Sequence, residues 1–418
     1  MKILVINSGS SSIKAAVFEQ TEAKRRLNNN VVADHNHLKK DLKELAKVTI
    51  DGIGLKRCKL SFKSENKNMG LPISVKNHEA GVKIITDHLL KNGIIKKLLE
   101  IETVGHRVVH GGEKYSNSIK IDSKIIKDLE ALSPLAPLHN PANIESIKAC
   151  KKLLPKAKQV AVFDTAFHQT IPPHAYLYGL PYKLYEDHKI RRYGFHGTSH
   201  KFVVEQTIKA LKTKKAKIIS CHIGNGISIT ASVNGKSVDT SMGFTPLEGV
   251  MMGTRCGSID PAIILHLQEN MKMKPAQINT MLNNQSGLLG ISETSRDMRD
   301  IYAKALKQDK KALLAIEMLN YQIAKYCGAF AAAMQGIEAL TFTGGIGENA
   351  FYVREKICDY LNFLGLKIDK KKNTEASSVK IAADKKPYAE ISEKKSKVKV
   401  FVIPTNEEKL IALESTKA

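Results

Sequence analysis

Two glycine-containing segments of the sequence have the residue types that bind phosphate. Residues 7–14 read Asn-Ser-Gly-Ser-Ser-Ser-Ile-Lys, and residues 222–226 read His-Ile-Gly-Asn-Gly. Glycine lets the backbone approach a ligand closely, and successive N–H groups in such a turn form an anion-binding concavity. A tight hairpin that binds nothing would explain either turn alone. Because Gly9 and Gly224 lie about half the chain apart, at matching places in two similar segments, phosphate binding is the favoured interpretation of both.

A third glycine-rich segment, Thr-Gly-Gly-Ile-Gly-Glu-Asn at residues 343–349, follows an apolar run and precedes a helix-like run. Glycines at the start of a helix suit anion and nucleotide binding, because free N–H groups point outward there. The glycine spacing does not match the dinucleotide fingerprint. A turn that merely ends one element and begins the next is the alternative interpretation.

Charged side chains occur in similar loops. Arg107, His196 and Arg255 lie in glycine-rich loops, and such groups can stabilise negative charge on a transferring phosphoryl group. Asp164 and Glu407 follow apolar strands, where carboxylates commonly face a ligand crevice. With phosphate nearby, Mg²⁺ is the expected ion. A surface ion pair, or a helix cap or turn acid, is the ordinary alternative for each residue taken alone.

The elements that must position these residues alternate between strands and helices. The apolar runs predict strands at residues 3–7, 15–18, 104–110, 160–163, 217–221, 227–233, 340–343 and 399–403. Helical spacing predicts helices at residues 79–90, from Asn140 as N-cap, from Thr198 to about residue 211, from residue 260, and at residues 313–330. Residues 20–70 and 369–397 are charged and give no clear pattern.

The strand–glycine turn–strand pattern of residues 3–18 recurs at residues 218–233. This repeat predicts an α/β fold of two duplicated lobes with a ligand cleft between them. The expected N-terminal lobe is residues 1–197, which contains the phosphate loop, and the C-terminal helix could belong to it. The expected nucleotide-binding lobe is residues 198–418.

Composition limits the class of protein. The 418 residues contain 43% hydrophobic and 25% charged residues, which is ordinary for globular proteins. No run approaches the ~20 apolar residues of a membrane span. The six cysteines are scattered without a C-x-x-C pair, which favours a reduced cytoplasmic setting and no zinc site. The net charge is +24, but the lysines are spread along the chain and there is no Trp, so a nucleic-acid surface is not expected.

Taken together, these segments resemble the acetate kinases, a family within the acetate and sugar kinase, Hsp70 and actin superfamily. The resemblance implies ribonuclease-H-like or actin-like lobes, reversible phosphoryl transfer between ATP and acetate to give ADP and acetyl phosphate, Mg²⁺, and a cytoplasmic homodimer. The matching stretches occur in family order at residues 5–14, 105–112, 137–141, 162–168, 193–200, 222–226, 241–249, 253–257, 342–349 and 403–408.

By the matched motifs, the resemblance assigns each candidate a role. Arg107 and Arg255 would hold the acyl phosphate, Asp164 would align or activate acetate, and His196 would stabilise the transferring group. Asn7 and Glu407 would form the metal site, with Lys14 at the phosphates. The apolar pocket for the methyl group would be Val109, Leu138, Phe195 and Pro246. The nucleotide site would be His222, Gly224, Asn225, Gly226, Asp297, Met298, Arg299, Gly345, Ile346, Gly347, Glu348 and Asn349.

One departure from the family pattern and several alternatives stay open. Ser258 stands where the family usually has Asp, which would alter hydrogen bonding near Arg255 but leave the arginine in place. A propionate or butyrate kinase would use the same motifs, since one methylene in a pocket is worth only ~1–3 kcal/mol. A sugar kinase is disfavoured because a neutral hydroxyl needs no arginine pair. A nucleotide-gated chaperone, a filament protein and an RNA-binding module are the alternatives outside the enzymes.

Overall fold

The computed structural model describes residues 1–21, 41–55, 57–136, 139–213 and 215–418. The chain forms two compact units. The first contains Met1–Ala166 and Asn406–Ala418, and the second contains Phe167–Thr405. The sequence placed this boundary at residues 197 and 198. The structure places it earlier because the intervening segment bonds to the second unit, for example from Thr170 Oγ1 to the carbonyl of Ser237 at 2.7 Å. The C-terminal helix does belong to the first unit.

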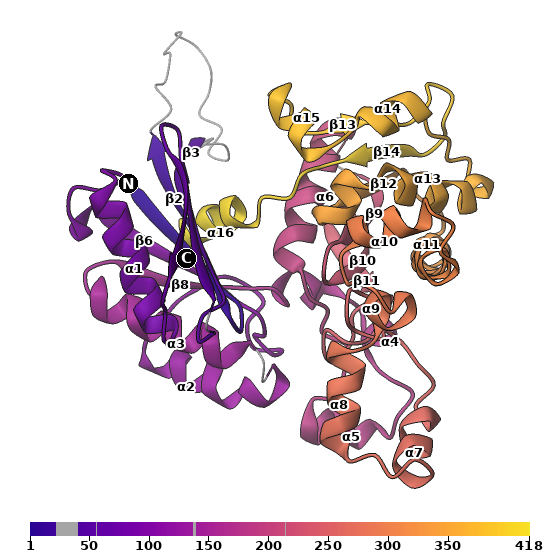
Figure 1. Ribbon diagram of the computed structural model, residues 1–418, viewed down its shortest axis with the longest axis horizontal. Helices are drawn as coiled ribbons and strands as arrows, with labels where there is room; N and C mark the ends of the chain where they lie inside the picture. The colour runs from indigo at the N-terminus through magenta and orange to yellow at the C-terminus, as the bar shows by residue number, and fades with distance from the viewer. Residues whose placement is uncertain (22–40, 56, 137–138, 214) are drawn as a thin grey trace. The chain divides into compact units, whose positions relative to one another are not determined.

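The first unit is built on an eight-stranded sheet with the order β5-β4-β3-β2-β1-β6-β8-β7 (Figure 1). β1 pairs antiparallel with β2 and parallel with β6. The strands are β1 (Lys2–Ser8), β2 (Ser12–Thr21), β3 (Asp41–Asp51), β4 (Cys58–Ser64), β5 (Asn68–Ile73), β6 (Ile101–Val108), β7 (Ile119–Lys120) and β8 (Lys158–Phe163). The helices are α1 (His78–Lys91), α2 (Ser123–Ala131), α3 (Asn140–Leu153) and α16 (Glu407–Ser415).

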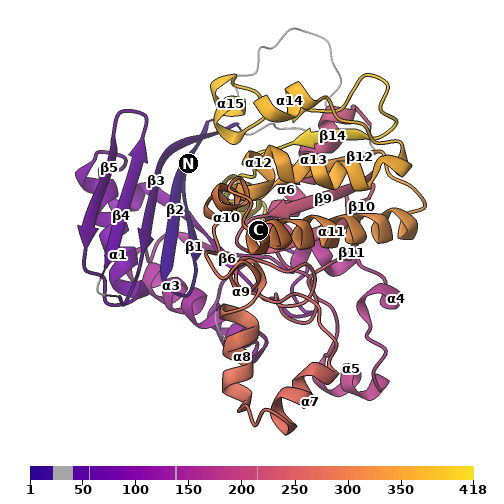
Figure 2. The ribbon, with the colours of Figure 1, turned by 45° about the vertical axis from the view of Figure 1, so that its right-hand side comes forward.

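The second unit is built on a six-stranded sheet with the order β11-β10-β9-β12-β14-β13 (Figure 2). β9 pairs antiparallel with β10 and parallel with β12. The strands are β9 (Lys217–Ile223), β10 (Ile227–Val233), β11 (Lys236–Thr240), β12 (Ala339–Thr343), β13 (Ala389–Glu390) and β14 (Lys399–Val402). The helices are α4 (Pro173–Tyr176), α5 (Tyr182–His188), α6 (Gly197–Leu211), α7 (Ala262–Glu269), α8 (Pro275–Asn284), α9 (Gly287–Ser292), α10 (Met298–Ala305), α11 (Lys310–Ala333), α12 (Gly344–Asn349), α13 (Phe351–Tyr360), α14 (Lys370–Glu375) and α15 (Ser378–Ala383).

The two sheets share one topology. The order β3-β2-β1-β6-β8 in the first unit matches β11-β10-β9-β12-β14 in the second, strand for strand. Each central strand has its hairpin partner on one side and a parallel strand on the other. This confirms the predicted α/β fold and its duplication. The glycine turns at Gly9 and Gly224 therefore occupy equivalent positions, each at the end of the central strand of its own sheet.

Burial on both faces explains why the central strands are continuous apolar runs. On β1, Leu4 and Ile6 pack with α1 and α3, whereas Ile3 and Val5 face the other way and pack with Ile411 of α16. Figure 1 shows α1 and α3 on one side of this sheet and α16 on the other. Each such fully buried side chain contributes ~1.5–3 kcal/mol relative to exposure.

Two predicted helix caps are wrong by one or two residues. α3 begins at Asn140 itself, with His139 as its N-cap. The Asn140 side chain is used instead to accept a hydrogen bond from the His110 N–H at 3.2 Å. α6 begins at Gly197 rather than after Thr198, and its N-cap is His196, in the left-handed region with φ 56°. In the described part of the chain, no helix has the length and apolar character needed to cross a membrane.

Candidate active site

In the first unit, Arg107 gathers three of the predicted residues. It lies near the end of β6, beside the end of β8, and Asp164 directly follows β8. Its Nε and Nη2 donate to the two oxygens of Asp164 at 2.9 and 2.5 Å. Its Nη1 donates to Asn7 Oδ1 at 3.0 Å, and its Nε lies 3.8 Å from Glu407 Oε2. The parallel strands β1, β6 and β8 thus end together and bring these groups to one edge of the sheet.

The electrostatics of this cluster keep Arg107 charged. Burial opposes the charge, but the carboxylates of Asp164 and Glu407 outweigh it and raise the pKa of the guanidinium above its ordinary value. The Asp164 side chain is 1% exposed and the Arg107 side chain 18%. A bidentate pair of this kind fixes the direction of the guanidinium as well as its charge. Asp164 therefore fixes the orientation of the Arg107 guanidinium.

Asn7 and Lys14 are directly opposite each other on β1 and β2, so their side chains leave the same face of the sheet. The Lys14 side chain is exposed. Asn7 offers an amide oxygen and Glu407 a carboxylate, and both are the oxygen donors that Mg²⁺ prefers. The donor set fits the predicted ion best at Glu407, because the Asn7 oxygen already accepts from Arg107.

The N-terminal turn of α3 supports this cluster, which the sequence did not reveal. Asn143 accepts a hydrogen bond from the Val109 N–H at 3.2 Å and donates to the Ser8 carbonyl at 2.7 Å. Ser8 Oγ in turn lies 2.7 Å from Ser146 Oγ. One helix therefore holds both the phosphate-type turn and the segment after Arg107. Only the Asn-Pro pair at residues 140 and 141 gave a signal in the sequence, and it indicated a helix start rather than a contact.

In the second unit, His196 and Arg255 both lie beside Gly226. A Cβ placed on Gly226 would be 2.8 Å from His196 Nε2 and 3.6 Å from Arg255 Nη1, so only glycine leaves room for both. The His196 ring stacks on His222 with centroids 4.4 Å apart. Ser199 donates to Thr405 Oγ1 at 2.9 Å and lies 2.8 Å from His222 Nδ1, so that nitrogen carries the hydrogen. The predicted turn and the two predicted cationic residues therefore form one cluster.

Arg255 differs from Arg107 in its electrostatics. Burial lowers the pKa of Arg255 below its ordinary value. Its Nη1 donates to the Pro246 carbonyl at 3.1 Å and to Met252 Sδ at 3.5 Å. Within the described residues, no carboxylate lies at ion-pair distance from it. A partly buried guanidinium with no carboxylate at this distance is a ready site for an anionic ligand.

A cavity of about 770 Å³ lies at the predicted nucleotide segments. Predicted residues that line it are Gly224, Asn225, Asp297, Met298, Arg299, Gly345, Ile346 and Asn349, and the sequence missed Arg296, Tyr302, Ala350 and Tyr352. The rings of Tyr302 and Tyr352 are stacked with centroids 3.6 Å apart. A volume of this size holds a drug-sized or nucleotide-sized molecule. The aromatic pair had no local signal, since its members come from α10 and α13.

Four predicted nucleotide residues of this unit do not line the cavity. His222 and Gly226 belong to the His196 cluster, and Gly347 is buried in α12. Glu348 points inward, where its Oε1 accepts from the N–H groups of Gly344 and Thr405 at 3.0 and 3.1 Å. Burial raises the pKa of Glu348 despite these bonds. Glu348 therefore braces the loop rather than facing a ligand.

The residues predicted for an apolar pocket are divided between the units. Val109 is buried in the first unit, and Phe195 and Pro246 lie in the second. Leu138 lies outside the described residues.

Ser258 Oγ accepts a hydrogen bond from the Gly249 N–H at 3.1 Å and lies 3.2 Å from the Tyr326 hydroxyl. The serine therefore ties together the two ends of the segment that contains Arg255.

A duplicated sheet, glycine turns at equivalent strand ends, two arginine centres and a nucleotide-sized cavity define a kinase of the two-lobed class. The chain belongs to the acetokinase family, whose model matches residues 2–413.

Individual relatives agree. The chain is 48% identical to the acetate kinase of Thermotoga petrophila over 99% of this chain and 98% of that protein. Its structure is similar to the crystal structure of Porphyromonas gingivalis acetate kinase, with a TM-score of 0.87, 42% identity, and 100% and 99% of the two chains covered. A propionate kinase from Francisella tularensis is as similar, with a TM-score of 0.86, 41% identity and the same coverage. The chain is therefore a phosphotransferase of this family.

Proposed function

We propose that this protein is an ATP-dependent acetate kinase. A carboxylate oxygen of acetate forms a bond to the γ-phosphorus of ATP, the bond from that phosphorus to the oxygen of ADP breaks, and acetyl phosphate and ADP result. The observation that carries the proposal is the position of His196 and Arg255 at Gly226, two residues from Gly224, which lines the nucleotide-sized cavity. Cationic side chains at the end of a nucleotide site are what phosphoryl transfer requires.

The residues of the first unit supply the acyl side of the reaction in this proposal. Arg107, held by Asp164, binds the acetate carboxylate or the acyl phosphate as a charged fork. Val109, which is buried just after β6, contributes apolar surface for the methyl group. Lys14 and Arg255 neutralise phosphoryl oxygens, and His196 donates to them. Neutralising two anions that must approach each other is the main contribution of these cationic groups.

Mg²⁺ is part of this proposal. Glu407, and Asn7 to a lesser degree, would hold it through oxygen atoms. When bound, the ion supplies charge neutralisation at the phosphate oxygens. Glu407→Gln is expected to raise the Mg²⁺ concentration at half-maximal rate by roughly tenfold, because the ligand loses its charge. A matched change at the exposed Glu65, Glu65→Gln, should leave that concentration unchanged.

The test is ADP release with ATP and a panel of acceptors: acetate, propionate, butyrate, glycerol and glucose, each with and without Mg²⁺. Acetate is expected to give the highest kcat/KM, and removal of Mg²⁺ is expected to abolish turnover. A rate with glycerol or glucose and none with acetate would reject the proposal.

Propionate kinase is the second candidate, because the Francisella tularensis propionate kinase is nearly as similar as the acetate kinase structures. One methylene changes binding by only ~1–3 kcal/mol, so both acids should react and the ratio of their kcat/KM values decides. A propionate value above that of acetate would favour this candidate.

The family resemblance supports three further proposals: a homodimer, a cytoplasmic location and no nucleic-acid partner. Ile263 and Leu265 of α7 are 45% and 55% exposed, which is unusual for large apolar side chains of one short helix. Light scattering should report twice the chain mass of 46.2 kDa. Oligonucleotide titrations should show no salt-dependent complex, and a steep salt dependence would contradict the third proposal.

A further inference from the structure

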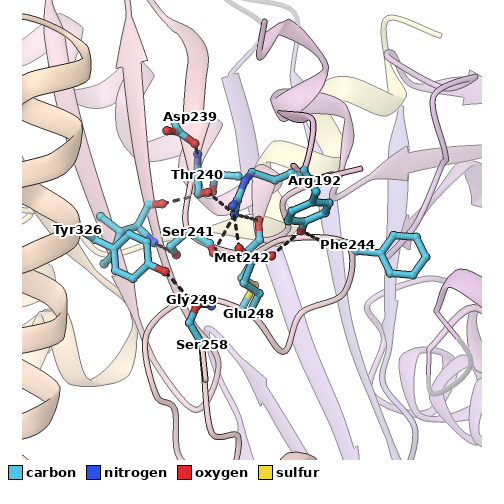
Figure 3. Close-up of polar contacts among 12 residues, drawn as sticks. Arg192, Asp239, Thr240, Ser241, Met242, Phe244, Glu248, Gly249, Ser258 and Tyr326 are labelled. Carbon is cyan, nitrogen blue, oxygen red and sulfur yellow. Dashed lines mark hydrogen bonds and ion pairs between the residues drawn. The ribbon is translucent and has the colours of Figure 1, made fainter. Parts of the chain in front are cut away.

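The loop from Ser241 to Gly249 is held from one side by Arg192. Figure 3 shows the guanidinium against the start of this loop. Its Nη1 donates to the carbonyls of Thr240, Ser241 and Met242 at 3.0, 3.1 and 3.3 Å. Its Nη2 donates to Glu248 Oε1 at 2.7 Å. A single side chain therefore joins the beginning of the loop to its end.

The other oxygen of Glu248 locks the loop from within. Glu248 Oε2 accepts a hydrogen bond from the Tyr178 hydroxyl, and that hydroxyl oxygen accepts from the Phe244 N–H at 2.8 Å. Burial and the nearby Glu248 raise the pKa of Tyr178, so the phenol stays protonated and keeps donating at neutral pH. A Cβ on Gly243 would lie 1.6 Å from Glu248 Oε2, so this arrangement requires a glycine there.

The loop carries the residue that contacts Arg255. Pro246 lies between the two tied points, Phe244 and Glu248, and its carbonyl accepts from Arg255 Nη1 at 3.1 Å. This is the one protein oxygen that the described structure gives Arg255. Any shift of the loop moves that oxygen, and the guanidinium must follow it or lose the bond.

The same loop is tied to the segment that precedes His196. The N–H groups of Tyr193 and Gly194 donate to the Gly243 carbonyl at 3.0 and 3.4 Å. Arg192 directly precedes Tyr193 in this segment, and the backbone N–H of Arg192 donates to the Tyr176 carbonyl at 2.7 Å. The network thus connects the backbone before His196 with the loop that faces Arg255.

We infer that Arg192, Glu248 and Tyr178 are positioning residues that set the positions of Arg255 and of Pro246. This inference rests on the proposed function, and it assigns the network a role in recognition of the acid rather than of the nucleotide. None of the three lines the nucleotide cavity. The network therefore predicts changes in the kinetics for the acid while the KM for ATP stays constant.

Arginine is required at residue 192 for a geometric reason. Its planar fork reaches three carbonyls on one side and a carboxylate on the other, whereas the ammonium of lysine is a compact point charge that cannot span both. A misplacement of ~1 Å away from the reacting atoms can cost on the order of 100-fold in rate. Arg192→Lys is therefore expected to lower kcat/KM for acetate by ~10- to 100-fold.

The experiment measures kcat and KM for acetate, propionate and ATP in four variants. Arg192→Lys, Glu248→Gln and Tyr178→Phe probe the network, and Lys311→Gln removes an exposed ion pair with Glu293 as the control. The three network variants should raise the KM for acetate, change the propionate-to-acetate ratio of kcat/KM at least threefold, and leave the KM for ATP within twofold. Lys311→Gln should match the wild type.

The outcomes separate this inference from the proposed function. If the wild type has no carboxylate kinase activity, the proposed function fails. If the wild type is active but the folded network variants keep its acid selectivity and its KM for acetate, the inference fails. An equal loss for both acids together with a raised KM for ATP would indicate general structural damage and would also overturn it. Tyr178→Phe removes one hydroxyl only, so it provides a folded variant even if Arg192→Lys unfolds.

Discussion

Replacing Arg107 should cost both stability and activity, and a double variant separates the two. Arg107→Gln leaves the carboxylate of Asp164, which is 1% exposed, without its bidentate partner at 2.9 and 2.5 Å. Breaking a buried pair by removing one member costs ~3–5 kcal/mol, because the remaining charge is buried and unpaired. For a unit of this size, that lowers the melting temperature by on the order of 10 °C.

The double variant Arg107→Gln with Asp164→Asn removes both charges. Its loss of unfolding free energy should therefore be smaller than the sum of the losses in the two single variants, and the difference, the coupling energy, should be ~1–3 kcal/mol. Activity should not return, because the guanidinium that binds the acid is absent. Each variant is expected to lose ~100-fold or more in kcat.

The chain has no Trp, so far-ultraviolet circular dichroism in urea is the suitable stability assay. Two compact units predict two transitions, and only the transition of the first unit should move. Lys148→Gln, which breaks the exposed pair with Glu130, is the control and should change stability by less than ~1 kcal/mol. A stability of Arg107→Gln equal to that of the wild type, or zero coupling in the double variant, would refute the reasoning.

Three other predictions follow from single features. Gly226→Ala places a Cβ 2.8 Å from His196 Nε2 and should lower kcat by roughly tenfold or more. The control is Gly328→Ala in α11, where nothing lies within 4 Å of the added Cβ; it should preserve kcat and stabilise the protein by up to ~1 kcal/mol. Equal rates in the two variants would contradict the steric argument. Tyr302→Ala should raise the KM for ATP by roughly tenfold and leave the KM for acetate unchanged, and the reverse pattern would remove Tyr302 from the nucleotide site. Burial lowers the pKa of His106 from 6.5 to about 4, so the unfolded chain takes up a proton first as the pH falls. Stability should therefore be lost between pH 6.5 and 4, and His106→Leu should flatten that slope in urea titrations; an unchanged slope would show that another group is responsible.

Much of the sheet framework could be predicted because its central strands are buried on both faces and form short apolar runs. β10 was predicted at its observed bounds, and β1 within a residue at each end. β3, β4 and β5 were missed. In β3, Leu42, Leu45 and Ala46 have helical spacing, and a bulge opposite Val17 and Phe18 interrupts the alternation. The spacing of apolar residues alone cannot identify such a strand.

Candidate residues that are close together in the chain were found, because a motif is visible within a few residues. Contacts that only the fold creates were not. Arg192 and Glu248 are 56 residues apart, and Asn143 and Ser8 are 135 apart. Glu348 shows the opposite case: its place in a glycine-rich loop predicted a ligand contact, but its side chain turns inward to two backbone N–H groups. Sequence indicates the loop and not the direction of each side chain.

The path of the chain has a consequence for biosynthesis. Residues 406–418 return from the second unit to cover Ile3 and Val5 on the first sheet, through Ile411 and Ala412. During translation, the second unit can reach its final packing once residue 405 has left the ribosome tunnel. The first unit, although its strands are made earlier, must wait with one apolar face uncovered until α16 emerges. The half of the protein that is synthesised first is thus the half that matures last.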